Sequence, residues 1–156
     1  MPTIQLTTWI AAPPERCFDL SRSIDLHVAS TAETGERAIG GVTSGLIGLG
    51  EEVTWRARHF GVWQTLTTRI TAFDSPRHFR DSMVRGVFTR FDHDHFFAPH
   101  DGGTEMRDVF DFTSPLGPLG RIADALVVTR HLRALLERRN QEIKEVAESE
   151  RWRALL

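Results

Sequence analysis

Two histidines stand two residues apart in the stretch FTRFDHDHFF, which runs from Phe88 to Phe97. His93 and His95 would share one face of a strand, because strand side chains alternate between the two faces. A turn at Asp101-Gly102, a sequence favoured in two-residue hairpins, would place Asp108 of the following strand opposite His95. Directly opposed Cβ atoms lie about 5 Å apart, so these two side chains are predicted to be within hydrogen-bonding range.

The same turn predicts which face of this hairpin is buried. The predicted register pairs Phe97 with Met106, His93 with Phe110, and Phe91 with Phe112. This face is aromatic and apolar apart from the two histidines and the carboxylate. The opposite face is charged and belongs in water; it carries Arg90, Asp92, Asp94, Arg107 and Asp111. A shift by one residue would bury the charged set, so the alternation determines the parity of the register.

Three kinds of chemistry remain open for His93, His95 and Asp108. They can satisfy one another and line a pocket as polar anchors for a ligand headgroup. Alternatively, His95 held by Asp108 can act as a general base that enolises a ketone in an aldol cyclisation or a dehydration. Two imidazoles and the carboxylate can also form a facial set of metal ligands. The surrounding phenylalanines suit an organic ligand better than a hydrated ion, so we predict no metal and no cofactor.

Further pocket residues are expected on neighbouring strands. Trp55 and His59 share the parity of Val53 and Ala57, and Asp81 shares the parity of Met83 and Arg85. If these parities face inward, they add to the same pocket. The predicted ligand-binding set is Trp55, His59, Asp81, Met83, Phe91, His93, His95, Phe97, Met106, Asp108 and Phe110, with His95 and Asp108 catalytic if the protein is an enzyme.

Other polar groups are expected to have no special role. His27, His78, His100 and His131 are predicted to be exposed or to lie on a helix surface. The basic group Arg138, Arg139 and Lys144 alternates with Glu137, Glu142 and Glu145, which is typical of a solvated helix face.

The elements that must position these residues follow from the changes in hydrophobic period. Strands are predicted at residues 3–10, 36–39, 53–57, 66–70, 79–85, 88–97 and 104–113, joined mostly by short turns, which indicates an antiparallel sheet. Two short helices follow the first strand, the first beginning at Pro13-Pro14 and the second covering residues 24–29. From SPLGPLG at residues 114–120 the period becomes helical as far as Glu148, over a length of about 45 Å.

The long helix has a single apolar stripe, so it needs a long surface to lie on. The stripe consists of Leu119, Ile122, Leu126, Thr129, Leu132, Leu136, Ile143 and Ala147. The sheet is the surface available. The predicted fold is therefore α+β, a helix-grip fold in which a seven-stranded curved antiparallel sheet wraps around a long C-terminal helix.

The segment GGVTSGLIGLG, residues 40–50, has five glycines among eleven residues but lacks the lysine and the spacing of a phosphate-binding loop. With Leu46, Ile47 and Leu49 exposed or half-exposed, it would form a mobile lip at the mouth of a cavity. A flexible loop that packs these side chains on the C-terminal helix is the alternative.

Length and composition point to one domain at residues 1–149 and a tail at residues 150–156. The formal net charge is −2 and the basic residues are scattered, so no nucleic-acid partner is expected. No signal-like start and no apolar run of about 18 residues is present, so we expect a cytoplasmic protein, as a monomer or a homodimer. Cys17, the one cysteine, is predicted to be a buried apolar side chain.

The element order, together with APPERCFDL, GLIGLGEEVTW, FRDSMVRGVF, FDHDHFF and GGTEMRDVFDFTSPLG, resembles the START / birch-pollen-allergen-like (SRPBCC) superfamily. More narrowly, the chain is similar to its bacterial polyketide cyclase/dehydrase-like or lipid-transport-like members. The resemblance implies a cavity between the sheet and the long helix, but supplies no catalytic motif. The expected function is binding of a small hydrophobic or amphipathic ligand, such as a lipid, a sterol or a polyketide-like molecule; the alternative is a cyclase or dehydratase that uses the His-Asp pair.

Overall fold

A seven-stranded antiparallel sheet forms the body of the molecule in the computed structural model, which describes residues 2–114, 118, 122 and 124–156. The strand order is β1-β7-β6-β5-β4-β3-β2, so every link between consecutive strands from β2 to β7 joins neighbours. The strands are β1 (Thr3–Ile10), β2 (Arg37–Gly41), β3 (Glu52–His59), β4 (Val62–Asp74), β5 (His78–Arg85), β6 (Arg90–His100) and β7 (Gly103–Thr113). The predicted seven strands are confirmed.

The helices are short between β1 and β2 and long after β7. They are α1 (Pro14–Ser21), α2 (Ile24–Ser30), the 3-10 turn η1 (Ala32–Thr34), the π-helical turn η2 (Asp124–Val128), α4 (Thr129–Ala147) and the 3-10 turn η3 (Glu150–Ala154). Proline occupies the first turn of α1, where a missing N–H costs nothing, and Glu15 stands beside it. Ser23 caps α2 by accepting a hydrogen bond from the backbone N–H of Leu26.

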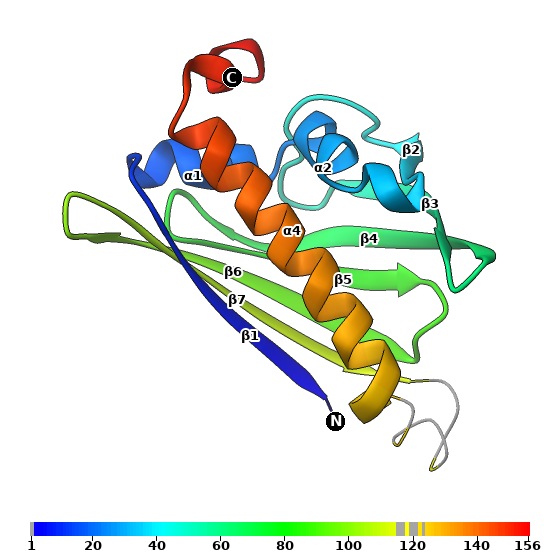
Figure 1. Cartoon of the computed structure of the whole chain (residues 1–156). Coiled ribbons are helices and arrows are strands. Elements are labelled where there is room, and N and C mark those ends of the chain that lie inside the picture. Colours follow the sequence, from blue (N-terminus) through cyan, green and yellow to red (C-terminus); the bar gives the residue numbers. More distant parts are fainter. Residues whose placement is uncertain (1, 115–117, 119–121, 123) are drawn as a thin grey trace.

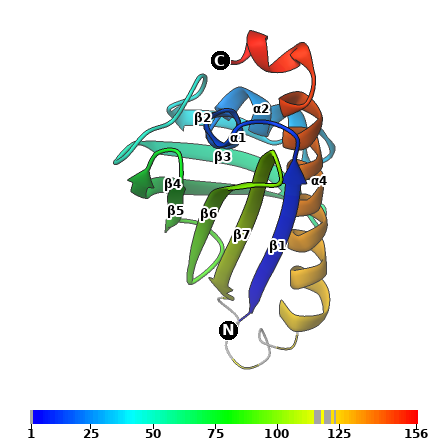
Figure 2. The ribbon, with the colours of Figure 1, turned by 90° about the vertical axis from the view of Figure 1, so that its left-hand side faces the viewer.

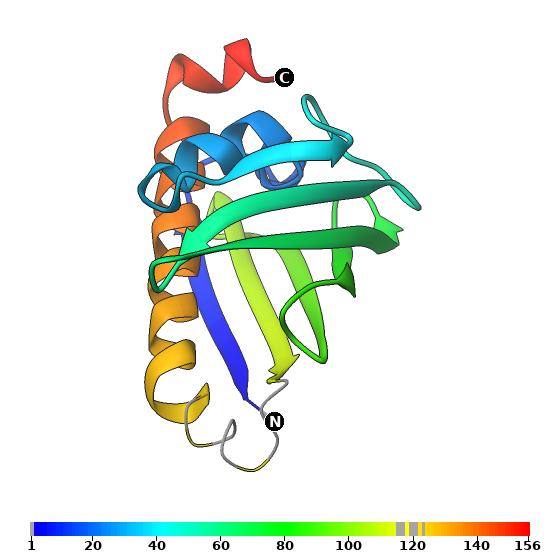
Figure 3. The same cartoon turned by 90° about the vertical axis from the view of Figure 1, so that its right-hand side faces the viewer.

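The sheet bends around α4, as predicted for a helix-grip fold. Figure 1 shows α4 running diagonally across the sheet, with α1 and α2 at the end where α4 finishes. In Figure 2 the strands β3 and β4 cross the direction of β1 and β7, and Figure 3 shows the same bend from the opposite side. Among the helices of the described part of the chain, none is long and apolar enough to span a membrane.

The turns that set the register have the predicted chemistry. Asp101 and Gly102 have φ values of 47° and 77°, the pair of positive values that a two-residue hairpin turn favours. Phe60 and Gly61, with φ values of 51° and 77°, form the β3–β4 turn in the same way. In β6 and β7 the observed partners include His95 opposite Asp108, so the predicted register is confirmed.

The N-terminal part of the predicted apolar stripe is wrong. Ile122 and Leu126 are 61% and 58% exposed, and Leu119 lies outside the described residues. The physical reason is the π-helical turn Asp124–Val128 before α4, because its wider turn puts the side chains before and within it out of the 3.6-residue phase of α4. Within α4 itself the stripe is correct, since Leu136 packs on a cluster of phenylalanines and Ile143 is buried.

The glycine-rich segment is tied to the link between α1 and α2. Its Ile47 is buried and donates its backbone N–H to the carbonyl of Arg22, and Leu46 forms an isolated bridge with Ser23. The predicted exposure of Ile47 is therefore wrong, because Ile47 packs against the link between α1 and α2, a contact that cannot be predicted from the local sequence. Leu49 is exposed, as predicted.

Candidate functional site

A cavity of about 400 Å³ lies between the concave face of the sheet and α4, within the size range of small-molecule sites. Its walls come from β3 to β7, α2 and α4. The lining residues that the sequence predicted are Trp55, His59, Asp81, Phe91, His93, His95 and Phe110. The cavity reaches the surface near Phe60 and Val87, two lining side chains that are largely exposed.

Four other residues of the predicted set lie elsewhere. Phe97 and Met106 belong to the main core, where Phe97 packs edge-on against Phe18. Met83 packs against the second core cluster, next to Gly86. Asp108 is fully buried behind the histidine rings and does not line the cavity.

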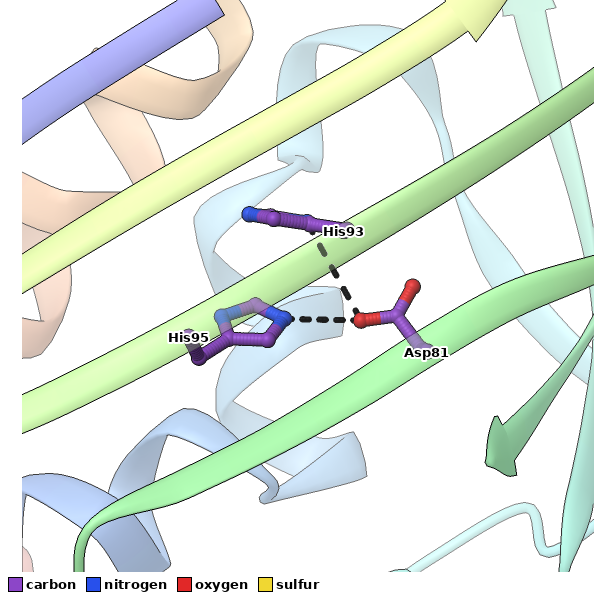
Figure 4. A group of neighbouring side chains, drawn as sticks. All are labelled: Asp81, His93 and His95. Carbon is purple, nitrogen blue, oxygen red and sulfur yellow. Dashed lines mark hydrogen bonds and ion pairs between the residues drawn. The ribbon is translucent and has the colours of Figure 1, made fainter. Parts of the chain in front are cut away.

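A cluster of polar side chains lines the cavity on β5 and β6. Asp81 of β5 pairs with His93 of β6 across the sheet, and His95 of β6 pairs with Asp108 of β7. Oδ2 of Asp81 lies 2.7 Å from Nε2 of His95 and 3.9 Å from Nδ1 of His93. Figure 4 shows both rings converging on this one carboxylate oxygen. The pairing of β5 with β6 therefore brings Asp81 into the pocket, where the sequence analysis expected it only if the parity of that strand faced inward.

Asp108 holds the cluster together from behind. Its Oδ1 lies 2.9 Å from Nε2 of His93 and 3.2 Å from Nδ1 of His95. Its Oδ2 accepts a hydrogen bond of 2.7 Å from the Asn140 side chain. The predicted proximity of His95 and Asp108 is present, but the shorter bond of Asp108 is to His93, and the shorter bond of His95 is to Asp81.

Arg139 and Asn140 are the members of the cluster that sequence reasoning missed. Arg139 was predicted to lie on a solvated face, yet it is 5% exposed and places Nη1 3.5 Å from Oδ1 of Asp108. Its Nη2 donates to the carbonyl of Ser21 and lies 3.4 Å from Nδ1 of His95. A signal was available: the apolar stripe of the helix is interrupted between Leu136 and residue 143, and residues 139 and 140 fill that gap on the same face.

The electrostatics of the cluster are balanced. Burial acts to lower the pKa of His95, but the hydrogen bonds with Asp108 and Asp81 outweigh it and raise that pKa above its ordinary value. Burial acts to raise the pKa of Asp108, yet its bonds to both histidines hold the pKa well below the ordinary range. With the His95 ring protonated, the cluster contains two carboxylates, one guanidinium and one imidazolium, so its formal charges cancel.

His93 differs from His95 in its free ring nitrogen. Burial, reinforced by the neighbouring His95, lowers the pKa of His93 below its ordinary value. Asp108, as a carboxylate, accepts a hydrogen bond from the Nε2–H of His93, which leaves the lone pair of Nδ1 facing Asp81 and the cavity. Among the described residues, no hydrogen bond reaches that Nδ1, and the Asp81 oxygen lies 3.9 Å from it.

A second histidine pair lies nearer the mouth. Nδ1 of His59, at the end of β3, is 2.9 Å from Nε2 of His131 in α4, and the exposed ring of Phe60 packs against His131 at a tilt of 46°. Burial lowers the pKa of both histidines. His131 had been predicted to be without a role, but it lines the cavity because α4 presents it to the β3–β4 turn.

The remaining histidines divide between the cavity and the outer surface. His27, also predicted to be without a role, lines the cavity and hydrogen-bonds to Glu36. Its ring packs against Trp55 at a tilt of 38°, with 4.3 Å between ring centroids. His78 binds Asp94 on the outer face of the sheet, and His100 is exposed.

Two sets of side chains are candidates for holding a cation. The set expected from the sequence, His93, His95 and Asp108, does not face the cavity as a whole, because Asp108 contacts both rings but does not line the cavity. The set that the structure assembles is Asp81, His93 and His95, whose ligand atoms all lie within 4.8 Å of one another.

Comparison with known proteins agrees with this architecture. Residues 1–148 match the family model described as polyketide cyclase / dehydrase and lipid transport, which confirms the resemblance drawn from the sequence. No curated protein sequence matches the chain.

Solved structures share the fold at low identity. TTHA0849 from Thermus thermophilus is 18% identical with a TM-score of 0.72, over 94% of this chain and 99% of that one. CV1439 from Chromobacterium violaceum is 15% identical with a TM-score of 0.71, over 96% and 99% of the two chains. Ara h 8.0201 is 14% identical with a TM-score of 0.68, over 94% and 97%. At such identities the likeness concerns the fold alone.

Proposed function

We propose, since the chain belongs to the polyketide cyclase / dehydrase and lipid transport family, that it binds a small amphipathic molecule in the cavity between the sheet and α4. One observation carries the proposal: an apolar cavity of about 400 Å³ is lined by a cluster of hydrogen-bonding groups, Asp81, His93 and His95, in which both histidines are buried. An organic ligand would place its apolar body against Trp55, Phe91 and Leu136, and its oxygen atoms at His93 and Asp81.

The expected affinity is moderate. A ligand that buries about 400 Å² of apolar surface gains roughly 10 kcal/mol. Loss of translational and rotational freedom costs at least about 4 kcal/mol. The difference corresponds to a Kd of tens of micromolar. Hydrogen bonds at the polar end would then select among ligands of similar size.

A ligand panel tests the proposal. The tag-free protein is titrated with fluorescent fatty acids, sterols and aromatic polyketide-like molecules, and native mass spectrometry identifies any molecule that co-purifies. The variant Ala57→Phe fills the cavity from β3 and should weaken binding at least about tenfold, since Ala57 lines the cavity. Arg58→Phe, one residue further along on the exposed face, is the matched control. Binding that is equal in both variants would place the ligand elsewhere.

A second candidate, acid/base catalysis, is supported by the free nitrogen of His93. Nδ1 faces the cavity while Asp108 holds Nε2, an arrangement that orients an imidazole for proton abstraction. In a β-hydroxy ketone, Nδ1 would take the proton from the carbon between the carbonyl and the hydroxyl-bearing carbon, as the C–H electrons form the enolate. When the enolate electrons then form the C=C bond, the C–O bond breaks and Nδ1 returns the proton to the departing hydroxide as water. The structure favours His93 for this role over the predicted His95, which is engaged by a carboxylate on each side.

Kinetics distinguish the two candidates. If the protein is an enzyme, His93→Gln should lower turnover of a poly-β-ketone substrate by about 100-fold or more while ligand affinity changes little. If the protein is a carrier, no turnover is measured with wild type, and the variant changes only affinity.

A further inference from the structure

The two histidine rings and Asp81 present three potential ligand atoms to one point in the cavity. These atoms are Nδ1 of His93, Nε2 of His95 and Oδ2 of Asp81, and they lie within 4.8 Å of one another (Figure 4). Bonds of about 2.1 Å in tetrahedral geometry separate ligand atoms by about 3.4 Å. The distances of 2.7 Å and 3.9 Å from the Asp81 oxygen bracket that value, and the two ring nitrogens lie at most 4.8 Å apart. Side-chain rotations would therefore bring all three atoms to one ion.

The opposite nitrogen of each ring is held by one buried carboxylate. Nε2 of His93 and Nδ1 of His95 both contact Oδ1 of Asp108. A carboxylate in this position fixes the ring tautomer, so that the lone pairs point at a metal, and it increases the basicity of the ligands. Asp108 is itself fixed by Asn140 and Arg139. The cluster therefore has both an inner set of ligands and an outer set of orienting groups.

We infer from this arrangement that Asp81, His93 and His95 bind one divalent transition-metal ion. Two imidazoles and one carboxylate suit Zn²⁺, Fe²⁺ or Co²⁺, whereas Mg²⁺ and Ca²⁺ require mostly oxygen ligands. Coordination displaces the proton shared by His95 and Asp81, which is released to solvent. The remaining coordination positions face the cavity, where a carbonyl or enolate oxygen of an organic ligand can occupy them.

The charge of the site is compatible with such an ion. The Asp81 carboxylate is the one anionic ligand, and Asp108 behind the rings adds a second negative charge against the single charge of Arg139. A divalent ion replacing one proton raises the net charge of the cluster by one unit. An anionic oxygen from a cavity ligand would restore neutrality, so metal and enolate-type ligands are expected to bind cooperatively.

Titration with metal alone tests the inference without reference to the organic ligand. Tag-free protein is treated with a chelator, dialysed and titrated with Co²⁺, followed by visible absorption and by calorimetry with Zn²⁺. We expect one ion per chain. Asp81→Asn, His93→Ala and His95→Ala should each weaken binding more than about 100-fold, beyond the 10–100-fold effect of orienting groups. Asp108→Asn should fall within that smaller range.

Two controls separate this site from other histidines. His78→Ala removes a histidine that binds Asp94 on the outer face of the same two strands, and His59→Ala disrupts the other histidine pair of the cavity. Both should leave Co²⁺ binding unchanged. A variant that combines Asp81→Asn, His93→Ala and His95→Ala gives the background uptake of Co²⁺. Loss of binding in His59→Ala, retention of binding in Asp81→Asn, or uptake by the wild type that is no greater than this background would each overturn the inference.

A measurement on the wild type covers the case in which a variant fails to fold. In the Co²⁺ protein, the ring N–H groups of both ligating histidines should give hyperfine-shifted proton signals. Because both protons lie against the buried Asp108, they should exchange slowly with solvent. Two such signals support the site. Their absence from a complex that contains one Co²⁺ ion per chain contradicts it. Either result leaves the ligand-binding proposal to be decided by its own panel.

Discussion

Replacement of Asp108 by asparagine is the perturbation that tests the buried cluster most directly. Asp108 is 0% exposed and contacts both histidines, Arg139 and Asn140. The NH₂ group of the new asparagine would face one of the N–H donors that now bind Asp108, so that two donors would oppose each other. The guanidinium of Arg139 would remain buried without the carboxylate that balances its charge. Removing one member of a buried ion pair costs about 3–5 kcal/mol.

That cost is large enough to measure in a chain of this size. For a domain of 150 residues or more, each kcal/mol lowers Tm by about 2–4 °C, so Asp108→Asn should lower Tm by roughly 6–20 °C. Urea denaturation followed by circular dichroism gives the free energy of unfolding. The matched control is Asp111→Asn on the same strand, which faces outward and pairs with the partly exposed Arg90. That pair is worth about 1 kcal/mol or less.

A double variant separates charge from packing. Arg139→Met keeps an unbranched apolar side chain but removes the guanidinium, whose positive charge Asp108 balances. In Asp108→Asn/Arg139→Met the destabilisation should be smaller than the sum of the two single effects by about 0.5–3 kcal/mol, the usual range for coupled neighbours. If Asp108→Asn is no more destabilising than Asp111→Asn, the interpretation of the cluster as a balanced set of buried charges is wrong.

Three further predictions concern the histidine pair at the mouth of the cavity, the end of β2 and the thiol of Cys17. Burial lowers the pKa of His59 and His131, so their contribution to stability is present above the unfolded-state pKa of about 6.5 and is lost as the pH falls below it. Urea unfolding measured at about pH 7.5 and pH 5.5 should therefore show a smaller decrease in the free energy of unfolding for His59→Gln than for the wild type. Gly41→Ala should destabilise by about 2 kcal/mol or more, and by more than Gly45→Ala, since both have positive φ but only at Gly41 would a Cβ lie 2.1 Å from a backbone oxygen; equal melting temperatures would refute this. Cys17 is fully buried and burial raises the pKa of its thiol, so an aromatic disulfide reagent should label it only after unfolding, and rapid labelling of the native protein would contradict the structure.

The β6–β7 hairpin could be predicted from the sequence because its causes are local. The alternation of Phe91, His93, His95 and Phe97 selects the buried face, and Asp101-Gly102 supplies the positive φ angles of the turn. Together they determine that two imidazoles and a carboxylate share the inner surface. The order of strands and helices likewise follows from local period and from proline and glycine positions.

The partners of those imidazoles depended on contacts distant in sequence. Asp81 meets them because β5 pairs with β6, and Arg139 and Asn140 meet Asp108 because α4 crosses the sheet with that face inward. Sequence reasoning assigned Arg139 to solvent, since an arginine among glutamates on a helix is usually hydrated. Local chemistry determined which residue types face inward and the parity of the strands. Packing determined the charge balance, the free nitrogen of His93 and the convergence on Asp81. The reason is that only packing removes these groups from water and brings them together as partners.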